Sequence, residues 1–197
     1  MRALAFAAII ACTSAATASD KAQEENTFKA PSGRFTIIQR WTRPDYIGTD
    51  KDCHGECGWR ALLQFTDKSK RQVILADEPE WYVWPADYRI SPDEKWIIRD
   101  QKTGSGENSF FLYRLGPDGD VWRRVESVDD AVFAALLTPL HHTRRDYYHV
   151  QIALVSWDLP AGRLHLKAYA TANDREHEHI NGRSVMYDLN KHVATAE

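Results

Sequence analysis

The sequence predicts an all-β protein with antiparallel sheets and one short helix. The main indication is a series of three β-patterned runs in the middle of the chain, at residues 95–101, 109–115 and 121–125. Turn sequences rich in Gly, Pro and Asp separate them, at residues 103–106 and 116–120. Strands joined by such short turns pair with their neighbours in antiparallel fashion. A two-sheet sandwich and a small stack of blade-like sheets both satisfy this pattern.

Alternation of side chains predicts which residues of the first central run share a face. Trp96 and Ile98 are expected on the core face of the strand, and Ile97 and Arg99 on the other. Burial of Trp96 would make this hairpin a main source of stability.

The chain before the central runs contains three further strand patterns. These are residues 35–41, 60–66 and 72–77, each rich in β-branched or apolar side chains. The last two are separated by a short charged turn and are expected to form a hairpin. Residues 19–33 are polar, and we expect a lead-in without regular structure there.

The β pattern is interrupted by one helical segment at residues 127–137. Ser127 followed by Asp130 resembles a capping box, and acidic residues suit the positive end of a helix. Apolar side chains recur at helical spacing up to Pro139, before which the helix should end.

Three strand patterns complete the chain, at residues 147–158, 163–171 and 185–189. This makes nine predicted strands in a single domain spanning residues 27–193, with a loose tail.

The composition is that of a globular protein with a substantial core. Apolar residues make up 43% of the 197 residues, and there are seven Trp, eight Tyr and seven Phe. The formal net charge of −3 provides no electrostatic basis for a nucleic-acid partner. The sequence contains no Gly-x-Ser-x-Gly elbow, phosphate-binding loop, dinucleotide fingerprint or His-Glu-x-x-His pattern, so we expect no cofactor and identify no catalytic motif.

The N-terminus resembles a secretory signal peptide covering residues 1–18. Arg2 precedes an apolar stretch at residues 3–11, which is too short to span a bilayer, and residues 16–18 form an Ala-x-Ala cleavage pattern. The sequence therefore predicts a periplasmic or secreted protein. An alternative is lipidation of Cys12 in a lipobox-like context, which would make the protein a lipoprotein.

Cys53 and Cys57 are the two cysteines that remain after cleavage. In an exported chain the simplest expectation is that they form a disulfide bond. Metal binding by this loop is the alternative, and it would need ligands from elsewhere in the fold.

An aromatic segment before the central runs is a candidate binding surface. Trp81, Tyr82 and Trp84 lie close together in sequence, and aromatic rings can stack on sugar rings. Packing of these rings against the sheet is the more common outcome for such a segment, and it is favoured here.

His177 and His179 form the most suggestive cluster of polar side chains. At this spacing on a strand they would share one face and could ligate one metal ion. An exposed polar loop is the favoured interpretation. Further histidines that the fold could bring near are His54, His141, His142 and His149.

The segment Ser91-Pro92-Asp93-Glu94-Lys95-Trp96 resembles the SPDGKW motif of TolB-like β-propeller blades. The resemblance covers about one blade, and Glu94 stands where that family usually has Gly. It implies a blade-like antiparallel sheet and a structural turn, and it carries no catalytic residues. A six- or seven-bladed propeller is excluded, because the mature chain could hold at most about four blades.

Taken together, these observations predict an exported β-rich binding or interaction module that contacts a protein or a component of the cell envelope. Loops on a rigid sheet scaffold commonly carry such contacts. The alternatives are a metal-dependent hydrolase that uses His177 and His179, and a purely structural envelope protein. The oligomeric state stays open.

Overall fold

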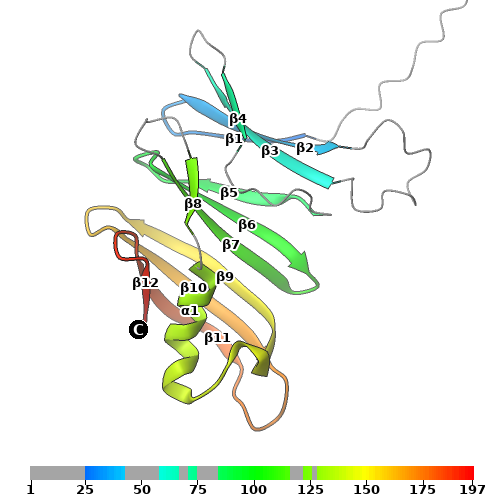
Figure 1. Cartoon of the computed structure of the whole chain (residues 1–197), viewed down its shortest axis with the longest axis vertical. Helices are drawn as coiled ribbons and strands as arrows, with labels where there is room; N and C mark the ends of the chain where they lie inside the picture. The colour runs from blue at the N-terminus through cyan, green and yellow to red at the C-terminus, as the bar shows by residue number, and fades with distance from the viewer. Residues whose placement is uncertain (1–24, 43–57, 67–70, 75–83, 116–121, 126–127) are drawn as a thin grey trace, which may run out of the picture.

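The computed structural model has an elongated shape, with three four-stranded antiparallel sheets arranged one after another (Figure 1). The residues that the structure describes are 25–42, 58–66, 71–74, 84–115, 122–125 and 128–197. The all-β prediction is confirmed, and the arrangement is a stack of meanders rather than a two-sheet sandwich. Within each sheet, strands adjacent in sequence are adjacent in space, as short connections favour.

The first four strands form sheet A, the next four sheet B and the last four sheet C. Sheet A contains β1 (Glu25–Lys29), β2 (Phe35–Thr42), β3 (Gly58–Phe65) and β4 (Gln72–Ile74). Sheet B contains β5 (Ala86–Ile90), β6 (Trp96–Gly104), β7 (Glu107–Leu115) and β8 (Trp122–Val125). Sheet C contains β9 (Tyr147–Asp158), β10 (Arg163–Ala172), β11 (Ile180–Asp188) and β12 (Val193–Ala196).

Three strands were not predicted: β1, β5 and β12. The lead-in and the tail were expected to lack regular structure, yet β1 pairs with β2 and β12 pairs with β11. In the aromatic segment, β5 begins directly after Pro85 and pairs with β6. All three lie at an edge of their sheet and have four or five residues, so their alternation pattern is short.

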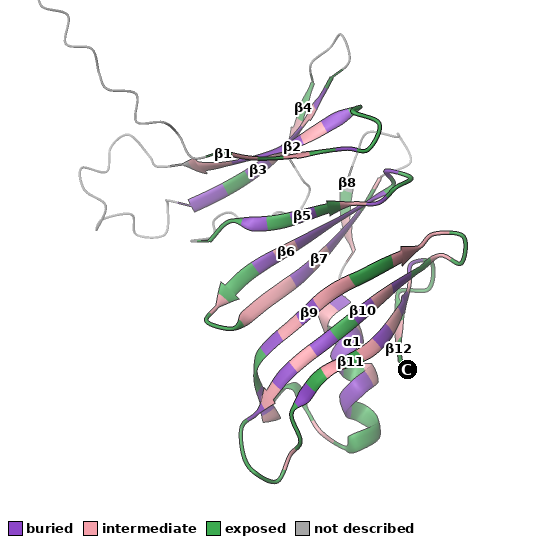
Figure 2. Ribbon diagram, turned by 180° about the vertical axis from the view of Figure 1, so that it is seen from behind, coloured by how far each residue is buried: buried purple, intermediate pink, exposed green. Residues whose placement is uncertain are grey.

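Sheet B is the middle layer, and both of its faces are buried (Figure 2). Trp96 and Ile98 contribute to a core shared with the helix and sheet C. Ile97 and Tyr113 contribute to a second core shared with sheet A. The predicted alternation is therefore confirmed, but the face of Ile97 and Arg99 is also a core face because sheet A covers it.

The first hairpin of each sheet uses a similar turn. The sequences are Ala-Pro-Ser-Gly-Arg-Phe at residues 30–35, Ser-Pro-Asp-Glu-Lys-Trp at 91–96 and Leu-Pro-Ala-Gly-Arg-Leu at 159–164. The fourth residue has a left-handed backbone in each case, with φ of 74° at Gly33, 56° at Glu94 and 66° at Gly162. Glycine adopts this conformation without steric cost, whereas Glu94 does not.

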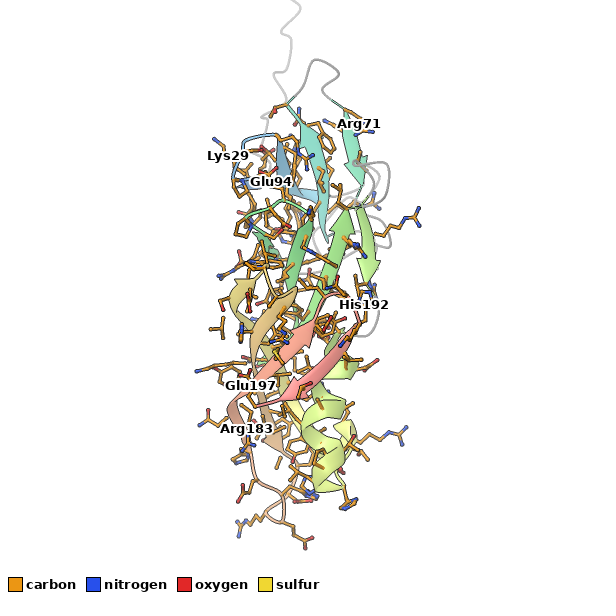
Figure 3. The ribbon with its side chains drawn as sticks, turned by 90° about the vertical axis from the view of Figure 1, so that its left-hand side faces the viewer. Lys29, Arg71, Glu94, Arg183, His192 and Glu197 are labelled. Atoms are coloured by element: carbon orange, nitrogen blue, oxygen red, sulfur yellow. The ribbon has the colours of Figure 1, made fainter. Side chains whose placement is uncertain are left out.

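Glu94 connects two sheets, which accounts for a non-glycine residue at this strained position. Its carboxylate accepts hydrogen bonds from Ser32 N at 2.6 Å and Ser32 Oγ at 2.9 Å, and it lies 3.3 Å from Arg34 Nε. Figure 3 shows Glu94 beside the β1–β2 end of sheet A, near Lys29. The expected structural turn is present, and its side chain also attaches sheet B to sheet A.

Amide side chains join successive sheets. Gln39 of β2 is fully buried. With its amide assigned so that the oxygen faces Ala86 N, the oxygen accepts from Ala86 N at 2.9 Å and the nitrogen donates to Ala86 O at 3.3 Å. Asn108 of β7 accepts from Ile152 N at 3.0 Å and donates to Ile152 O at 3.1 Å. Each amide thus satisfies both backbone groups of one residue in the first strand of the next sheet.

Helix α1 (Val128–Leu137) closes the larger core. It packs against β7, β11 and β12, and it continues into the 3-10 turn Thr138–Leu140. The helix begins one residue after the predicted capping residue Ser127, which lies outside the described residues, and Asp129 and Asp130 occupy its first turn as predicted. In the part of the chain that the structure describes, no helix is long and apolar enough to cross a membrane.

Candidate functional site: a polar cleft beside Trp84

A polar cleft of about 450 Å³ lies where the β6–β7 hairpin of sheet B meets sheet C. Side chains on one face of β6 continue the series Trp96 and Ile98 with Asp100 and Lys102. The core residues of this face thus give way to polar residues toward the hairpin tip. The lining residues are Pro85, Asp87, Asp100, Lys102, Gly104, Gly106, Glu107, Asn108 and Gln151.

Cross-strand pairing brings the polar residues of sheet B together. Asp87 of β5 lies directly opposite Asp100 of β6, and Lys102 lies opposite Asn108 of β7. Residues opposite each other in an antiparallel pair have Cβ atoms about 4.5–5.5 Å apart. Three neighbouring strands therefore present their side chains to one small volume.

Hydrogen bonds fix the wall of the cleft formed by Asn108. Besides pairing with the backbone of Ile152, Asn108 Nδ2 donates to Asp100 Oδ1. On the sheet C side, Gln151 Nε2 donates to Gly106 O at 2.8 Å. The contacts that hold sheet C against sheet B therefore also shape the cleft.

A buried network positions Trp84 and Lys102. Gln101 is fully buried, and its Nε2 donates to Trp84 O at 3.0 Å and to Lys102 O at 2.9 Å. Its Oε1 accepts from the guanidinium of Arg99, which is also fully buried. Lys102 Nζ lies 5.2 Å from the centre of the Trp84 ring, a cation–π contact, and Trp84 is 38% exposed.

Charges in the cleft are mixed. Asp87 is paired with Arg89, whose Nε lies 3.1 Å from Asp87 Oδ2. Burial raises the pKa of Asp100, the hydrogen bond from Asn108 opposes this rise, and the nearby charge of Asp87 adds to it. The lining of the cleft therefore contains three carboxyl groups, one ammonium group and two amides, so acidic side chains outnumber basic ones.

Of the three residues of the candidate aromatic surface, the structure describes Trp84. Trp84 lies next to the cleft, beside Lys102 and Pro85. Trp81 and Tyr82 lie outside the described residues, as do Cys12, Cys53 and Cys57 with the predicted signal peptide.

His177 and His179 have different hydrogen-bond partners in the structure. Both lie in the turn before β11 rather than on a strand. His177 Nδ1 lies 2.7 Å from Asp174 Oδ1, and its ring is 4.3 Å from the ring of His142, centre to centre. His179 Nδ1 accepts from Ala172 N at 3.0 Å. Among the described residues, no group of three or more His, Cys, Asp or Glu side chains is arranged to hold a metal ion.

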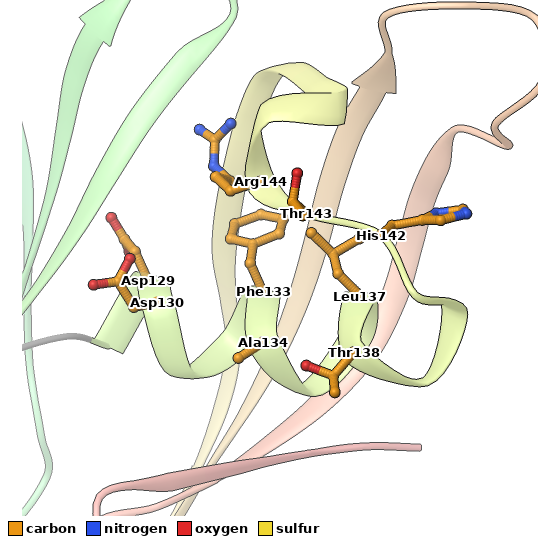
Figure 4. A pocket seen from close by; sticks show the side chains of 9 residues that line it. All are labelled: Asp129, Asp130, Phe133, Ala134, Leu137, Thr138, His142, Thr143 and Arg144. Carbon is orange, nitrogen blue, oxygen red and sulfur yellow. The ribbon is translucent and has the colours of Figure 1, made fainter.

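A second, smaller pocket of about 210 Å³ lies along helix α1 (Figure 4). Asp129 and Asp130 lie at one end, and the Arg144 guanidinium lies 5.4 Å above the Phe133 ring. His142 points away from these residues in Figure 4. The Asp129 carboxylate is already engaged, because it accepts from Phe110 N at 3.0 and 3.2 Å. This pocket is therefore the weaker candidate.

The residues of the cleft were not identified as a site from the sequence. The available signal was the change from Trp96 and Ile98 to Asp100 and Lys102 along one face of a predicted strand. Such a change indicates where a core face ends. Comparison with known proteins adds no functional evidence, because no family model, no curated protein and no solved structure matches this chain.

Proposed function

We propose that this protein is an exported binding module that contacts a component of the cell envelope through the cleft beside Trp84. The observation that carries the proposal is the construction of the cleft: its polar groups come from four strands and are held by buried hydrogen bonds. Preorganised polar groups next to an exposed aromatic ring are typical of ligand sites. Export follows from the predicted signal peptide at residues 1–18.

The volume and the position of the cleft agree with this role. About 450 Å³ lies within the range of about 300–1,000 Å³ that is usual for small-ligand sites. It lies at the junction of two sheets, where the Asn108–Ile152 contact limits relative movement. A site on such a scaffold loses little conformational entropy on binding.

The test is cosedimentation of the purified mature protein with washed bacterial envelope particles. We expect saturable binding that Trp84→Ala and Glu107→Gln weaken by at least about tenfold. Val193→Ala and Glu176→Gln are controls at exposed positions outside the cleft lining. Val193 is 50% exposed on β12, at the opposite edge of sheet C from β9, and Glu176 is exposed in the turn before β11. Equal binding by all variants, or no binding by the wild type, would refute the proposal.

A further inference from the structure

We infer that the ligand of the cleft is a saccharide, an inference that rests on the proposed function of the cleft as the binding site. This ligand class fits the polar groups of the cleft, their fixed orientation, the neighbouring indole ring and the volume of about 450 Å³.

The polar groups match a ligand with many hydroxyls. Asp87, Asp100 and Glu107 provide acceptors, Lys102 provides donors, and the Gln151 amide provides both. A hydroxyl group donates one hydrogen bond and accepts others, so a polyhydroxylated molecule can satisfy such a mixture. An anionic ligand such as a phosphate would face three carboxylates. The carboxylates of the cleft do not form a group arranged to hold a metal ion, as is true of all the described residues.

The fixed orientation of the Asp100 carboxylate also suits a ligand with several hydroxyl groups. Asp100 Oδ1 is bound by Asn108 Nδ2, and no hydrogen bond is assigned to Asp100 Oδ2 among the described residues. A planar carboxylate or amide held in this way can bind two adjacent hydroxyls of one sugar ring. Rigid attachment of Asn108 to Ile152 means that this orientation is set before the ligand arrives.

Trp84 supplies an apolar surface at the same place. An indole ring can pack against the C–H face of a pyranose ring, and its rigidity keeps the entropy cost low. The backbone of Trp84 is held by the buried Gln101 amide, and its ring contacts Lys102, a lining residue of the cleft. A volume of about 450 Å³ accommodates about one or two pyranose rings.

The first arm of the test uses chemically treated envelope particles. Periodate cleaves saccharides that carry vicinal diols, and a muramidase cleaves β-1,4-linked amino-sugar chains, which lack them. Both treatments leave most peptide bonds intact, whereas a protease does the reverse. We expect particles treated with periodate or with the muramidase to lose at least about tenfold in binding relative to mock-treated particles in at least one of the two treatments, and protease-treated particles to retain binding. Loss of binding after protease alone would identify a protein partner and overturn the inference.

The second arm uses defined soluble probes. A set of neutral oligosaccharides, including β-1,4-linked glucose and N-acetylglucosamine oligomers, is titrated calorimetrically up to about 10 mM, with inorganic phosphate and spermidine as charged probes. At least one oligosaccharide should bind the wild type and Val193→Ala with equal affinity, and should bind Trp84→Ala and Glu107→Gln at least about tenfold more weakly. Circular dichroism of each variant shows that it is folded.

The two proposals fail in different ways. If cleft variants lose envelope binding but no oligosaccharide binds or competes, the ligand class is wrong and the binding site stands. If envelope binding is unchanged in the cleft variants, the proposed function fails, and the saccharide inference fails with it.

Discussion

Asp129 lies at the start of helix α1 with its carboxylate against the backbone of β7. Strand β8 pairs with β7 only from Leu112 onward, so Phe110 N is satisfied by the Asp129 carboxylate instead. Burial raises the pKa of Asp129 to about 7, the hydrogen bond from Phe110 opposes this rise, and the charge of Asp130 adds to it. The Asp129 side chain thus satisfies the backbone N–H of Phe110, which β8 does not reach. Above about pH 7 the same side chain carries a buried negative charge, which is unfavourable.

Replacement of Asp129 by asparagine should change how stability depends on pH. The pKa of Asp129 is raised in the folded state, so its carboxyl favours folding fully below about pH 4, and this contribution is lost as the pH rises through about 7. The asparagine side chain does not titrate, so the stability of Asp129→Asn relative to wild type should rise by about 2–4 kcal/mol across this window. Urea unfolding at pH 4.5, 6 and 8 measures it, and a constant difference would contradict the assignment.

Asp174 should control the protonation of His177. Their hydrogen bond raises the pKa of His177 and lowers that of Asp174. We expect Asp174→Asn to lower the pKa of His177, as measured by NMR titration of the imidazole protons. In the wild type, this pair favours the folded state fully between about pH 4 and 6.5. The contribution is lost as the pH rises through the folded-state pKa of His177 and as it falls through that of Asp174. His165, in another part of sheet C, serves as the internal control, and an unchanged His177 titration would contradict the contact.

Strand β6 is the element on which the packing of the molecule depends. Trp96 is 6% exposed in the core shared with sheet C, and the Arg114 guanidinium lies 5.3 Å from its ring centre. Ile97 occupies the opposite core and is fully buried. A strand that contributes to two cores connects the stability of the layers on its two sides.

Trp96→Ala should therefore destabilise the fold by about 3–5 kcal/mol. Loss of the indole removes buried area and leaves a cavity between sheet B and its neighbours. Trp84→Ala is the matched control, since Trp84 is 38% exposed, and it should cost no more than about 1 kcal/mol. Chemical denaturation of both variants gives the comparison, and equal midpoints would contradict the assignment of Trp96 to the core.

At the scale of the whole molecule, amide and carboxylate side chains among the described residues join the three sheets. Gln39 attaches sheet A to β5, Asn108 attaches sheet B to β9, and Glu94 adds a second contact between sheets A and B. Each amide satisfies backbone groups on the free edge of the next sheet's first strand. These contacts set the position of one sheet relative to the next, and the apolar cores supply most of the stability.

Asn108→Ala should loosen the junction between sheets B and C. Removal of the amide leaves Ile152 N and Ile152 O unsatisfied, which should cost about 2–3 kcal/mol. Hydrogen exchange at the Ile152 amide should accelerate, while exchange at the Ala86 amide, held by Gln39, should change less. The converse pattern is expected for Gln39→Ala, and equal acceleration at both junctions in either variant would show that the sheets do not separate independently.

The sequence by itself determined the class of fold and most of the local structure. Alternation placed residues 147–158 on a strand with the bounds that the structure has, and the Ser91–Trp96 turn was recognised from its own residues. Both depend on interactions within a few residues: side-chain alternation along a strand, and the backbone angles that Pro and a left-handed residue allow. The short edge strands β1, β5 and β12 were missed because few residues carry their pattern.

Only the tertiary structure decided what lies against these elements. Asn108 meets Ile152, 44 positions away, and His177 meets His142 rather than sharing a strand face with His179. The cleft beside Trp84 exists because sheet C closes against the hairpin of sheet B. Alternation specifies which side chains share a face, but the layer that covers that face depends on how whole sheets pack, and no local pattern records this.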